Sequence, residues 1–176
     1  MEQRRHLVLT GFMGTGKTTI GRILAARFHR PFVDTDDLIT EQAGRSVAAI
    51  FADEGEAAFR AWEQRVAEHL AGERGLFIAT GGGFFLNPVN LALLAPVSQI
   101  ICLTARPETL VQRLQHNNSR PLLPAADRLA RIQALLAARA EIYDQFPQIE
   151  TDDRSLQAVA KEVMRLCQES NLLSQH

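Results

Sequence analysis

Long apolar runs, clustered cysteines and an excess of charge are all missing from this 176-residue chain. No stretch reaches the ~18 apolar residues that a membrane-spanning helix needs, and the chain does not open on a long apolar core. The net charge is -1 and 22% of the residues are charged, which is ordinary for a globular protein and argues against a basic nucleic-acid binder. We therefore expect a cytoplasmic protein that binds neither membranes nor nucleic acid.

Only two cysteines are present, Cys102 and Cys167, and they lie far apart with no C-x-x-C spacing. Cys102 also falls within the apolar run 100–103. This pattern indicates neither a zinc site nor a disulfide framework, so we expect two buried or inert thiols in a reducing compartment. The length suits one well-buried domain and is short for two, which predicts a single domain over residues 1–176.

Lysine is also scarce, because only two of the 19 basic residues are lysine. One of them is Lys17, in the motif G-x-x-x-x-G-K-T at residues 11–18. An apolar run at 6–10 precedes this motif, and a helical pattern of apolar residues at 20–28 follows it. Strand, loop and helix in this order are the context that a phosphate-binding P-loop requires. We interpret the motif as a nucleotide site, with a glycine-rich turn as the alternative.

The residue types in this motif suit a nucleotide phosphate and its metal ion. Glycines let the backbone turn over an anion, so that successive N–H groups and the positive end of the following helix point at it. Lys17 adds a full positive charge, and the hydroxyl of Thr18 is placed to hold Mg²⁺. The candidate nucleotide-binding residues of the motif are Gly14, Thr15, Gly16, Lys17, Thr18 and Thr19.

Two apolar residues at 32–33 run directly into the acidic residues Asp34, Asp36 and Asp37. This pattern predicts a short strand that delivers carboxylates at its carboxyl end, where ligands bind in open α/β sheets. Asp34 and Asp36, two apart on an extended segment, would share one side, and Asp34 is the candidate to complete the Mg²⁺ shell. The alternative is an acidic cap for a helix that begins at Leu38.

Residues 41–72 have a helical pattern, with breaks near Gly44 and Gly55. An apolar stripe runs between 59 and 70, and Arg60 lies just off that stripe with two glutamates near it. Taken alone, Arg60 is open to two interpretations, a surface ion pair or a residue that binds a ligand.

The apolar run 76–79 suits a buried parallel strand, and it ends in Thr80 followed by Gly81, Gly82 and Gly83. Three consecutive glycines cost conformational entropy, so their place at the carboxyl end of a strand indicates close approach of backbone to a ligand. A tight turn is the alternative.

Residues 97–103 predict another buried strand, and Pro107 then begins a helix that runs toward His116. From 117 to 126 the chain has turn-forming residues and one arginine, Arg120. A locally cationic loop in a phosphate-handling protein is typical of a lid that closes over the nucleotide. The alternative is a plain exposed loop.

A helix is predicted from about residue 127 to 146, and Arg139 falls within its apolar stripe, four residues after Leu135 and four before Tyr143. A buried arginine without a partner costs several kcal/mol, so an internal carboxylate or a bound anionic ligand must face it. A last strand at 148–151 and a closing helix from 156 complete the pattern.

Together these residues resemble the shikimate kinases, small P-loop kinases related to the nucleoside monophosphate kinases. The resemblance covers about residues 6–167. It rests on G-x-x-G-x-G-K-T at 11–18, D-T-D at 34–36, G-R-S at 44–46, G-E-x-x-F-R-x-x-E at 55–63, G-G-G at 81–83, R-P-L-L at 120–123 and R-x-x-x-Y at 139–143. Seven motifs in this order are specific as a set.

The resemblance implies an α/β fold, a three-layer α/β/α P-loop architecture with a five-stranded parallel sheet of order 2-3-1-4-5. It also implies a substrate-binding helical segment at about 35–62 and a lid at about 114–126. The implied activity is transfer of the γ-phosphate of ATP, with Mg²⁺, to the 3-hydroxyl of shikimate on the way to aromatic amino acids. We expect the protein to be a monomer.

Carried over by position, the resemblance assigns Lys17 and Thr18 to the phosphates and Mg²⁺, with Asp34 supporting the metal. It places Arg113 on the adenine and Arg120 on the phosphates. The residues implied to bind shikimate are Asp36, Arg60, Gly81, Gly82, Gly83 and Arg139. The residues implied to act in catalysis are Lys17, Asp36 and Arg120.

The chemistry of shikimate agrees with this assignment, because a carboxylate needs a bidentate cationic clamp and a hydroxyl needs an acid that accepts it. Arg60 and Arg139 can form the clamp, while Asp36 accepts a hydrogen bond or a proton from a hydroxyl. Both roles of Asp36 stay open, because phosphoryl transfer relies mainly on positioning and charge neutralisation and does not require a general base. Two other functions stay open. One is a kinase for another polyol acid such as gluconate, and the other is a nucleotide-dependent switch without a small-molecule acceptor.

Overall fold

The computed structural model describes residues 5–115 and 127–170, and within them five parallel strands form one sheet. The strands are β1 (His6–Gly11), β2 (Phe32–Asp34), β3 (Phe77–Ala79), β4 (Ser98–Thr104) and β5 (Gln148–Glu150). Their order, β2-β3-β1-β4-β5, confirms the sheet that the resemblance implied. All six residues of the central strand β1 are buried, because β3 and β4 pair with its two edges and helices cover its two faces.

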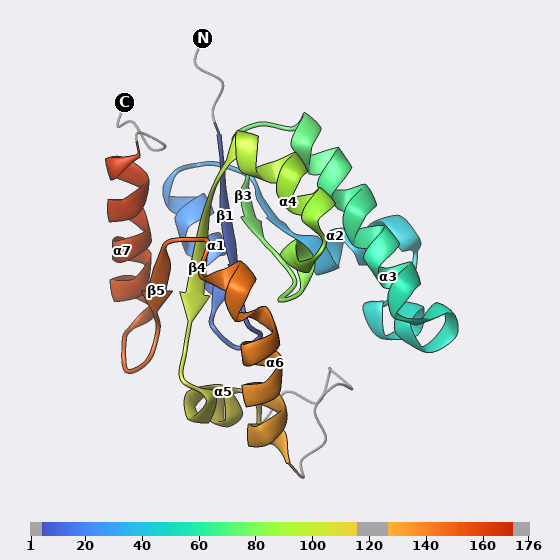
Figure 1. The fold of residues 1–176 in the computed structure, drawn as a ribbon. Helices are drawn as coiled ribbons and strands as arrows, with labels where there is room; N and C mark the ends of the chain where they lie inside the picture. Colours follow the sequence, from blue (N-terminus) through green and yellow to red (C-terminus); the bar gives the residue numbers. More distant parts are fainter. Residues whose placement is uncertain (1–4, 116–126, 171–176) are drawn as a thin grey trace.

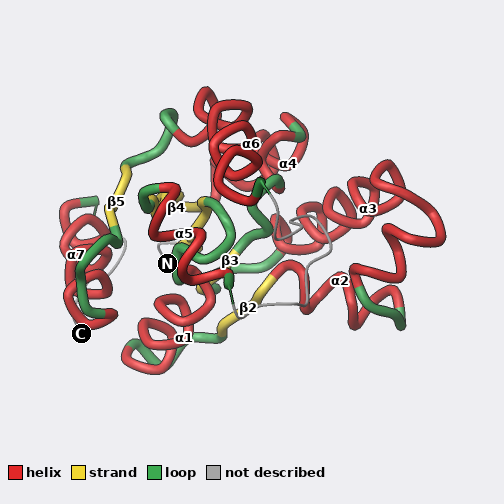
Figure 2. The backbone as a smooth tube through the Cα atoms, turned by 90° about the horizontal axis from the view of Figure 1, so that it is seen from below, coloured by secondary structure: helices red, strands yellow, loops and turns green. Residues whose placement is uncertain are grey.

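Helices cover both faces of the sheet (Figure 1). They are α1 (Lys17–Arg27), α2 (Thr35–Ala43), α3 (Val47–Gly72), α4 (Pro88–Leu94), α5 (Pro107–Leu114), α6 (Arg128–Tyr143) and α7 (Leu156–Glu169), with 3-10 turns at Phe84–Leu86 and Ala95–Val97. Figure 2 shows α1 and α7 on one side of the sheet, and α3 and α4 on the other. Alternate residues of β1 serve the two sides: Leu7 and Leu9 pack toward α1 and α7, and Val8 packs toward α3 and α4.

A third cluster of buried side chains lies at the carboxyl end of the sheet. Figure 1 shows α5 and α6 at this end. It joins Phe12 and Met13 of the loop after β1 to Cys102 of β4, Leu110 of α5 and Ile132 of α6. The loops that follow β1, β2, β3, β4 and β5 all emerge at this end, because the strands are parallel. The candidate site residues therefore approach one another although they are far apart in the sequence.

One expectation for the segment after β2 is wrong. Helix α2 begins at Thr35, not at Leu38, and Asp36 lies in its first turn, so Asp34 and Asp36 are not two residues of one extended segment. The cause is the side chain of Asp34, whose Oδ1 accepts from the backbone N–H of Asp36 at 3.0 Å and caps the helix. The cap that was considered as an alternative is present, three residues earlier than expected.

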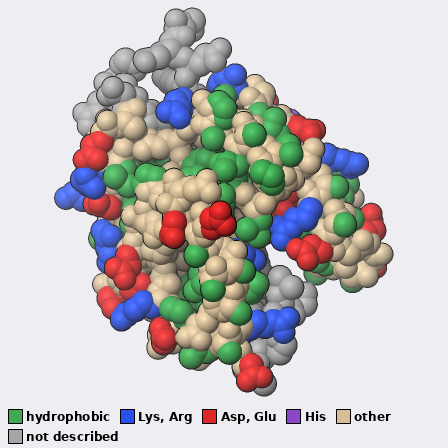
Figure 3. All heavy atoms as spheres, viewed as in Figure 1, with side chains coloured by type: hydrophobic (Ala, Val, Ile, Leu, Met, Phe, Trp, Pro, Cys, Tyr) green, Lys and Arg blue, Asp and Glu red, His purple; other side chains and the backbone are tan. Residues whose placement is uncertain are grey.

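Other boundaries agree with the sequence to within a few residues. Breaks were expected near Gly44 and Gly55, and the structure has the end of α2 at the first and a non-helical residue inside α3 at the second. Both cysteines are free and buried, as expected. In the part of the chain that the structure describes, no helix combines the length and the apolar character that a membrane crossing needs. Acidic and basic side chains are interspersed on the face seen in Figure 3.

Candidate active site

The P-loop connects β1 to α1 and carries the first part of the site. Gly16 caps α1 at φ 93°, a left-handed conformation that suits glycine, and Lys17 is the first residue of the helix. Gly11 leaves no room for a side chain, because a Cβ there would lie 2.1 Å from the carbonyl oxygen of Leu103. The hydroxyl of Thr15 and Nζ of Lys17 each donate to the carbonyl oxygen of Phe12 across 2.8 Å. The loop is thus closed on itself with its lysine folded inward.

The hydroxyl of Thr18 donates to Oδ2 of Asp34 across 2.8 Å, which joins the start of α1 to the end of β2. The second oxygen of the same carboxylate caps α2, so Asp34 holds two elements at once. A hydroxyl and a carboxylate beside a phosphate loop are hard oxygen ligands of the kind that Mg²⁺ takes. In contrast, residues 5–115 and 127–170 contain no group of three or more His, Cys, Asp or Glu that could form a metal cage by themselves.

The three glycines after β3 lie against three of the candidate site side chains. A Cβ on Gly81 would lie 2.9 Å from Oδ1 of Asp36, and one on Gly82 would lie 2.8 Å from Nη1 of Arg139. A Cβ on Gly83 would lie 2.8 Å from Nη1 of Arg60. None of the three has a positive φ. They are glycine because side chains from α2, α3 and α6 occupy the space where a Cβ would be.

Arg60 combines the two interpretations that its sequence position left open. It forms ion pairs within α3, from Nη1 to Oε2 of Glu63 at 2.7 Å and from Nη2 to Oε1 of Glu56 at 2.9 Å, and it faces Gly83 as well. Burial raises the pKa of the Glu63 carboxyl, and Arg60 offsets only part of that rise. Oε1 of Glu63 is buried without a hydrogen-bond partner among the described residues.

Arg139 points inward from α6, as its place in the apolar stripe predicted. Its guanidinium lies over the ring of Phe12, with Cζ 5.3 Å from the ring centroid. Tyr143, one turn further along α6, donates its hydroxyl to the carbonyl oxygen of Gly82 across 2.6 Å. Among the described residues, no carboxylate lies within 4.0 Å of the Arg139 guanidinium to form a salt bridge. Tyr143 shares a hydrogen bond with Arg139, and Glu63 acts on this arginine electrostatically. Nη1 of Arg139 faces the turn at Gly82.

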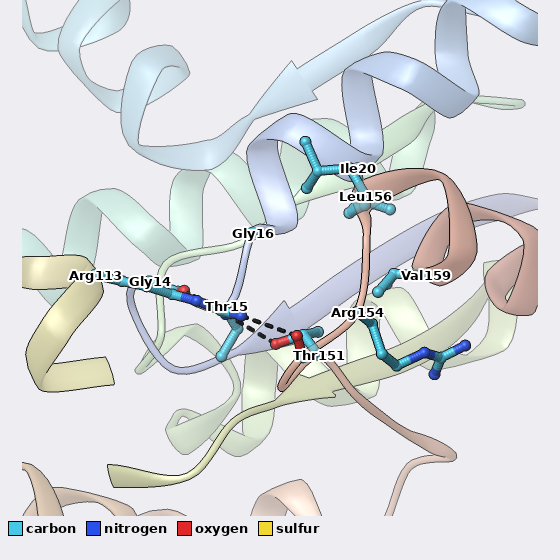
Figure 4. Close-up of a pocket in the computed structure, with 9 residues that line it drawn as sticks. All are labelled: Gly14, Thr15, Gly16, Ile20, Arg113, Thr151, Arg154, Leu156 and Val159. Atoms are coloured by element: carbon cyan, nitrogen blue, oxygen red, sulfur yellow. Dashed lines mark hydrogen bonds between the residues drawn. The ribbon is translucent and has the colours of Figure 1, made fainter. Parts of the chain in front are cut away.

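A pocket of about 200 Å³ lies beside the P-loop (Figure 4). It is lined by Gly14, Thr15, Gly16, Ile20, Arg113, Thr151, Arg154, Leu156 and Val159. Arg113 donates to the carbonyl oxygen of Gly14 at 3.1 Å and to both the hydroxyl and the carbonyl of Thr151 at 2.9 Å. Guanidinium planes and apolar side chains next to a phosphate loop can take a flat heterocycle.

The structure thus brings Lys17, Thr18, Asp34, Asp36, Arg60, Arg113, Arg139 and the three glycines to one end of the sheet. Thr19 is exposed on α1. Arg120 and most of the lid expected at 114–126 lie outside the described residues; Leu114 is the end of α5.

Sequence reasoning gave no role to two residues that shape the site. Phe12 accepts from Lys17 and lies under Arg139, and the hydroxyl of Thr35 accepts from the N–H of Gly81 at 3.0 Å. Glu63 was noted as a neighbour of Arg60 and as the last residue of the motif at 55–63, without a role of its own. The spacing of three residues in R-x-x-E could have identified it, because such pairs face each other on a helix.

Comparison with known proteins places this geometry in a family. A family model described as shikimate kinase matches residues 13–168. A shikimate kinase of Symbiobacterium thermophilum is 48% identical over 168 residues, which cover 93% of this chain and 97% of that protein. A shikimate kinase of Pelotomaculum thermopropionicum is 41% identical over 170 residues, covering 96% of this chain and 99% of that protein.

Solved structures agree. The shikimate kinase of Acinetobacter baumannii in complex with shikimate has a TM-score of 0.89 and 32% identity, and the match covers 96% of each chain. A gluconokinase of Sinorhizobium meliloti has a TM-score of 0.60 at 15% identity, which indicates a shared fold alone. On its sequence, its sheet and these relatives, the chain belongs to the shikimate kinase family.

Proposed function

We propose that this chain transfers the γ-phosphate of ATP to the 3-hydroxyl of shikimate, giving shikimate 3-phosphate and ADP. The observation that carries the proposal is the turn at Gly81–Gly83, where a carboxylate and two guanidinium groups meet three glycines in succession. The Cβ position of Gly82 also lies 3.4 Å from the carbonyl oxygen of Gly11, so this turn adjoins the start of the phosphate loop. An acceptor held at the turn is next to the nucleotide phosphates.

The carboxylate of shikimate is bound by Arg60 and Arg139 in this account. Each guanidinium presents a planar pair of donors, and each is fixed from behind, Arg60 by Glu63 and Arg139 by the ring of Phe12. No carboxylate among the described residues lies within salt-bridge distance of Arg139, and Glu63 acts on it only from further away, so an anionic ligand would supply its nearest counter-charge. This requirement favours an acid as the acceptor.

Asp36 accepts a hydrogen bond from the hydroxyl that is phosphorylated. Its Oδ1 points at Gly81, on the same turn that the two arginines approach, so a ring held by its carboxylate presents hydroxyls to Asp36. Phosphoryl transfer depends mainly on positioning and on neutralising charge, so orienting this hydroxyl is the larger part of the role. Replacement of Asp36 by Asn keeps the shape of the side chain, so it separates the orientation of the hydroxyl from the acceptance of its proton.

The P-loop N–H groups and Lys17 hold the transferred phosphate in this proposal; the Lys17 ammonium has three donors, and its bond to the carbonyl of Phe12 uses one of them. Thr18 and Asp34 would hold Mg²⁺ together with phosphate oxygens and water, since Mg²⁺ rarely uses a cage made only of protein. When bound, Mg²⁺ neutralises charge that develops on the phosphates. The pocket beside the loop takes the nucleoside end of ATP.

The catalytic unit in this proposal is a single chain, and we infer a monomer whose P-loop, Gly81–Gly83 turn and neighbouring pocket all lie at one end of the same sheet. We place the activity in the cytoplasm, where the buried thiols of Cys102 and Cys167 stay reduced.

A coupled assay of ADP release tests the proposed function with ATP, Mg²⁺ and three acceptor conditions: shikimate, gluconate and none. We expect release only with shikimate, in one-to-one ratio with a phosphorylated product. Release that depends on gluconate would favour the other polyol-acid kinase, and release at the same rate without an acceptor would favour the nucleotide switch.

A further inference from the structure

Helix α5 is capped by a residue from a distant segment. Arg106, which precedes the helix, provides no side-chain cap of its own. Instead the backbone N–H of Arg106 donates to the carboxylate of Asp152, which lies in the loop between β5 and α7. The nitrogen is 3.2 Å from Oδ1 and 3.0 Å from Oδ2. Nε of the same arginine lies 3.4 Å from Oδ1. One carboxylate therefore fixes the first turn of α5 to the loop after β5.

The contact between Asp152 and Arg106 favours the ionised form of the Asp152 carboxylate. Its side chain is 5% exposed, and burial alone would raise its pKa, but hydrogen bonds from the Thr109 hydroxyl and from Arg106 outweigh burial and hold the pKa below its usual value. The carboxylate is thus ionised at neutral pH, as the positive end of a helix favours. Asp153, next in the chain, pairs with the same arginine at 2.7 Å but is 87% exposed.

The carboxyl end of α5 also contacts the loop after β5, through Arg113. Arg113 donates to the hydroxyl and the carbonyl of Thr151, and that hydroxyl donates in turn to the carbonyl of Thr104 at the end of β4. Arg113 and Thr151 both line the pocket beside the P-loop, where Figure 4 shows the arginine reaching across to the threonine. Asp152 does not line that pocket. Its influence on a ligand there must pass through α5 and Thr151.

We propose that Asp152 is a positioning residue for nucleotide binding. By fixing the start of α5 against the loop after β5, it sets the distance between Arg113 and Thr151 and hence the shape of the pocket for the base. The inference rests on the proposed function only in that the pocket receives the nucleoside end of ATP. It makes no claim about the acceptor, whose site is built on α2, α3 and α6.

The test compares Asp152→Asn with Asp153→Asn in the full chain. The first keeps the size but removes the charge and one acceptor from the buried cap, and the second removes the exposed ion pair of the same arginine. Asn is also suited to the φ of 52° at position 153. Thr109→Val removes one donor to Asp152 and serves as a milder second variant.

Titration calorimetry with ADP alone gives the primary measurement. For Asp152→Asn we expect Kd for ADP and KM for ATP to rise about tenfold, with kcat and KM for shikimate within about twofold of wild type. Thr109→Val should shift the same quantities less, and Asp153→Asn should not shift them beyond about twofold. The split between the two substrates is what a merely structural loss would not produce.

Three results would overturn the inference. One is unchanged ADP affinity in a folded Asp152→Asn, another is an equal loss of ADP and shikimate binding, and the third is an equal effect of the two asparagine variants. Failure of the proposed function would give a different result. Wild type would bind ADP but would form no ADP from ATP in the presence of shikimate, while Asp152→Asn would still bind ADP more weakly than wild type.

Discussion

Nη1 of Arg60 donates to Oε2 of Glu63 across 2.7 Å, and only 1% of the glutamate side chain is exposed. The second oxygen of Glu63 faces the Cβ position of Gly81 at 3.4 Å, next to Asp36. A buried anion thus stands directly behind one of the two guanidinium groups proposed to hold shikimate. It fixes that group in place.

Glu63→Gln is expected to raise KM for shikimate by about five- to thirtyfold, because Arg60 loses its charged anchor and a charge-assisted hydrogen bond is worth about 1.5–3 kcal/mol before the amide replaces part of it. KM for ATP should not change. Glu56→Gln is the matched control, since Glu56 pairs with the same arginine but is 68% exposed. Steady-state kinetics with each substrate varied decide the matter, and equal effects of the two variants would remove the special role of Glu63.

Gly82→Ala and Gly83→Ala should raise KM for shikimate without unfolding the protein. Neither glycine has a positive φ, but the new methyl group would lie 2.8 Å from a guanidinium nitrogen of Arg139 or Arg60, and the long side chain would have to move. Gly72→Ala is the control, because nothing lies within 4 Å of its Cβ position in α3. Melting temperatures near wild type together with a KM raised about tenfold or more would agree with this account. Wild-type KM in both variants would contradict it.

His6 predicts a dependence of stability on pH. Its ring is buried between Leu70, whose carbonyl lies 3.1 Å from Nε2, and Leu76, whose N–H donates to Nδ1 at 3.1 Å. This pattern places the proton on Nε2. Burial lowers the pKa of His6; Arg74 and Arg30 add to that effect, and the bond to Leu70 opposes it.

Because the folded protein binds this proton less readily than the unfolded chain, the contribution of His6 is complete above about pH 6.5 and is lost as the pH falls toward the lowered folded pKa. His6→Gln should therefore flatten the curve of unfolding free energy below about pH 6.5, whereas the exposed His69→Gln should keep the wild-type slope. Urea denaturation at a series of pH values measures this. Parallel curves for wild type and His6→Gln would show that another group is responsible.

Lys17→Met should lower kcat by on the order of a hundredfold or more, because the loss of a preorganised charge at the moving phosphate costs at least ~3 kcal/mol. Lys161→Met is a natural control, since it removes the only other lysine, which is exposed on α7. Retention of more than about a tenth of the wild-type kcat would remove Lys17 from the catalytic assignment.

Much of the fold could be predicted from the sequence because its signals are local. The G-K-T motif between an apolar run and a helical pattern, and the apolar run that ends in Gly81, fix two strands and the end at which their loops meet. The buried position of Arg139 followed from its spacing alone. The strand order itself came from the resemblance, since no local pattern specifies which strands pair.

The rest depends on contacts between distant residues. The start of α2 at Thr35 follows from the cap by Asp34, and the same carboxylate also binds Thr18, so neither role alone describes it. The sequence indicated close approach at the three glycines but could not say that side chains from three different helices fill the space. The ring of Phe12 under Arg139 has no sequence signal, because only the packing of the P-loop against α6 brings them together.

Arg139 binds the carboxylate of shikimate in the proposed function, and a shikimate titration of wild type and Arg139→Lys tests this most directly. The exposed Arg131→Lys on the same helix is the control. Lysine keeps the charge but loses the planar pair of donors, so KM for shikimate should rise by roughly ten- to a hundredfold, equivalent to ~1.4–2.8 kcal/mol, with KM for ATP unchanged. Saturating shikimate should also raise the melting temperature of wild type more than that of the variant. An unchanged KM together with an equal rise in melting temperature would contradict the claim.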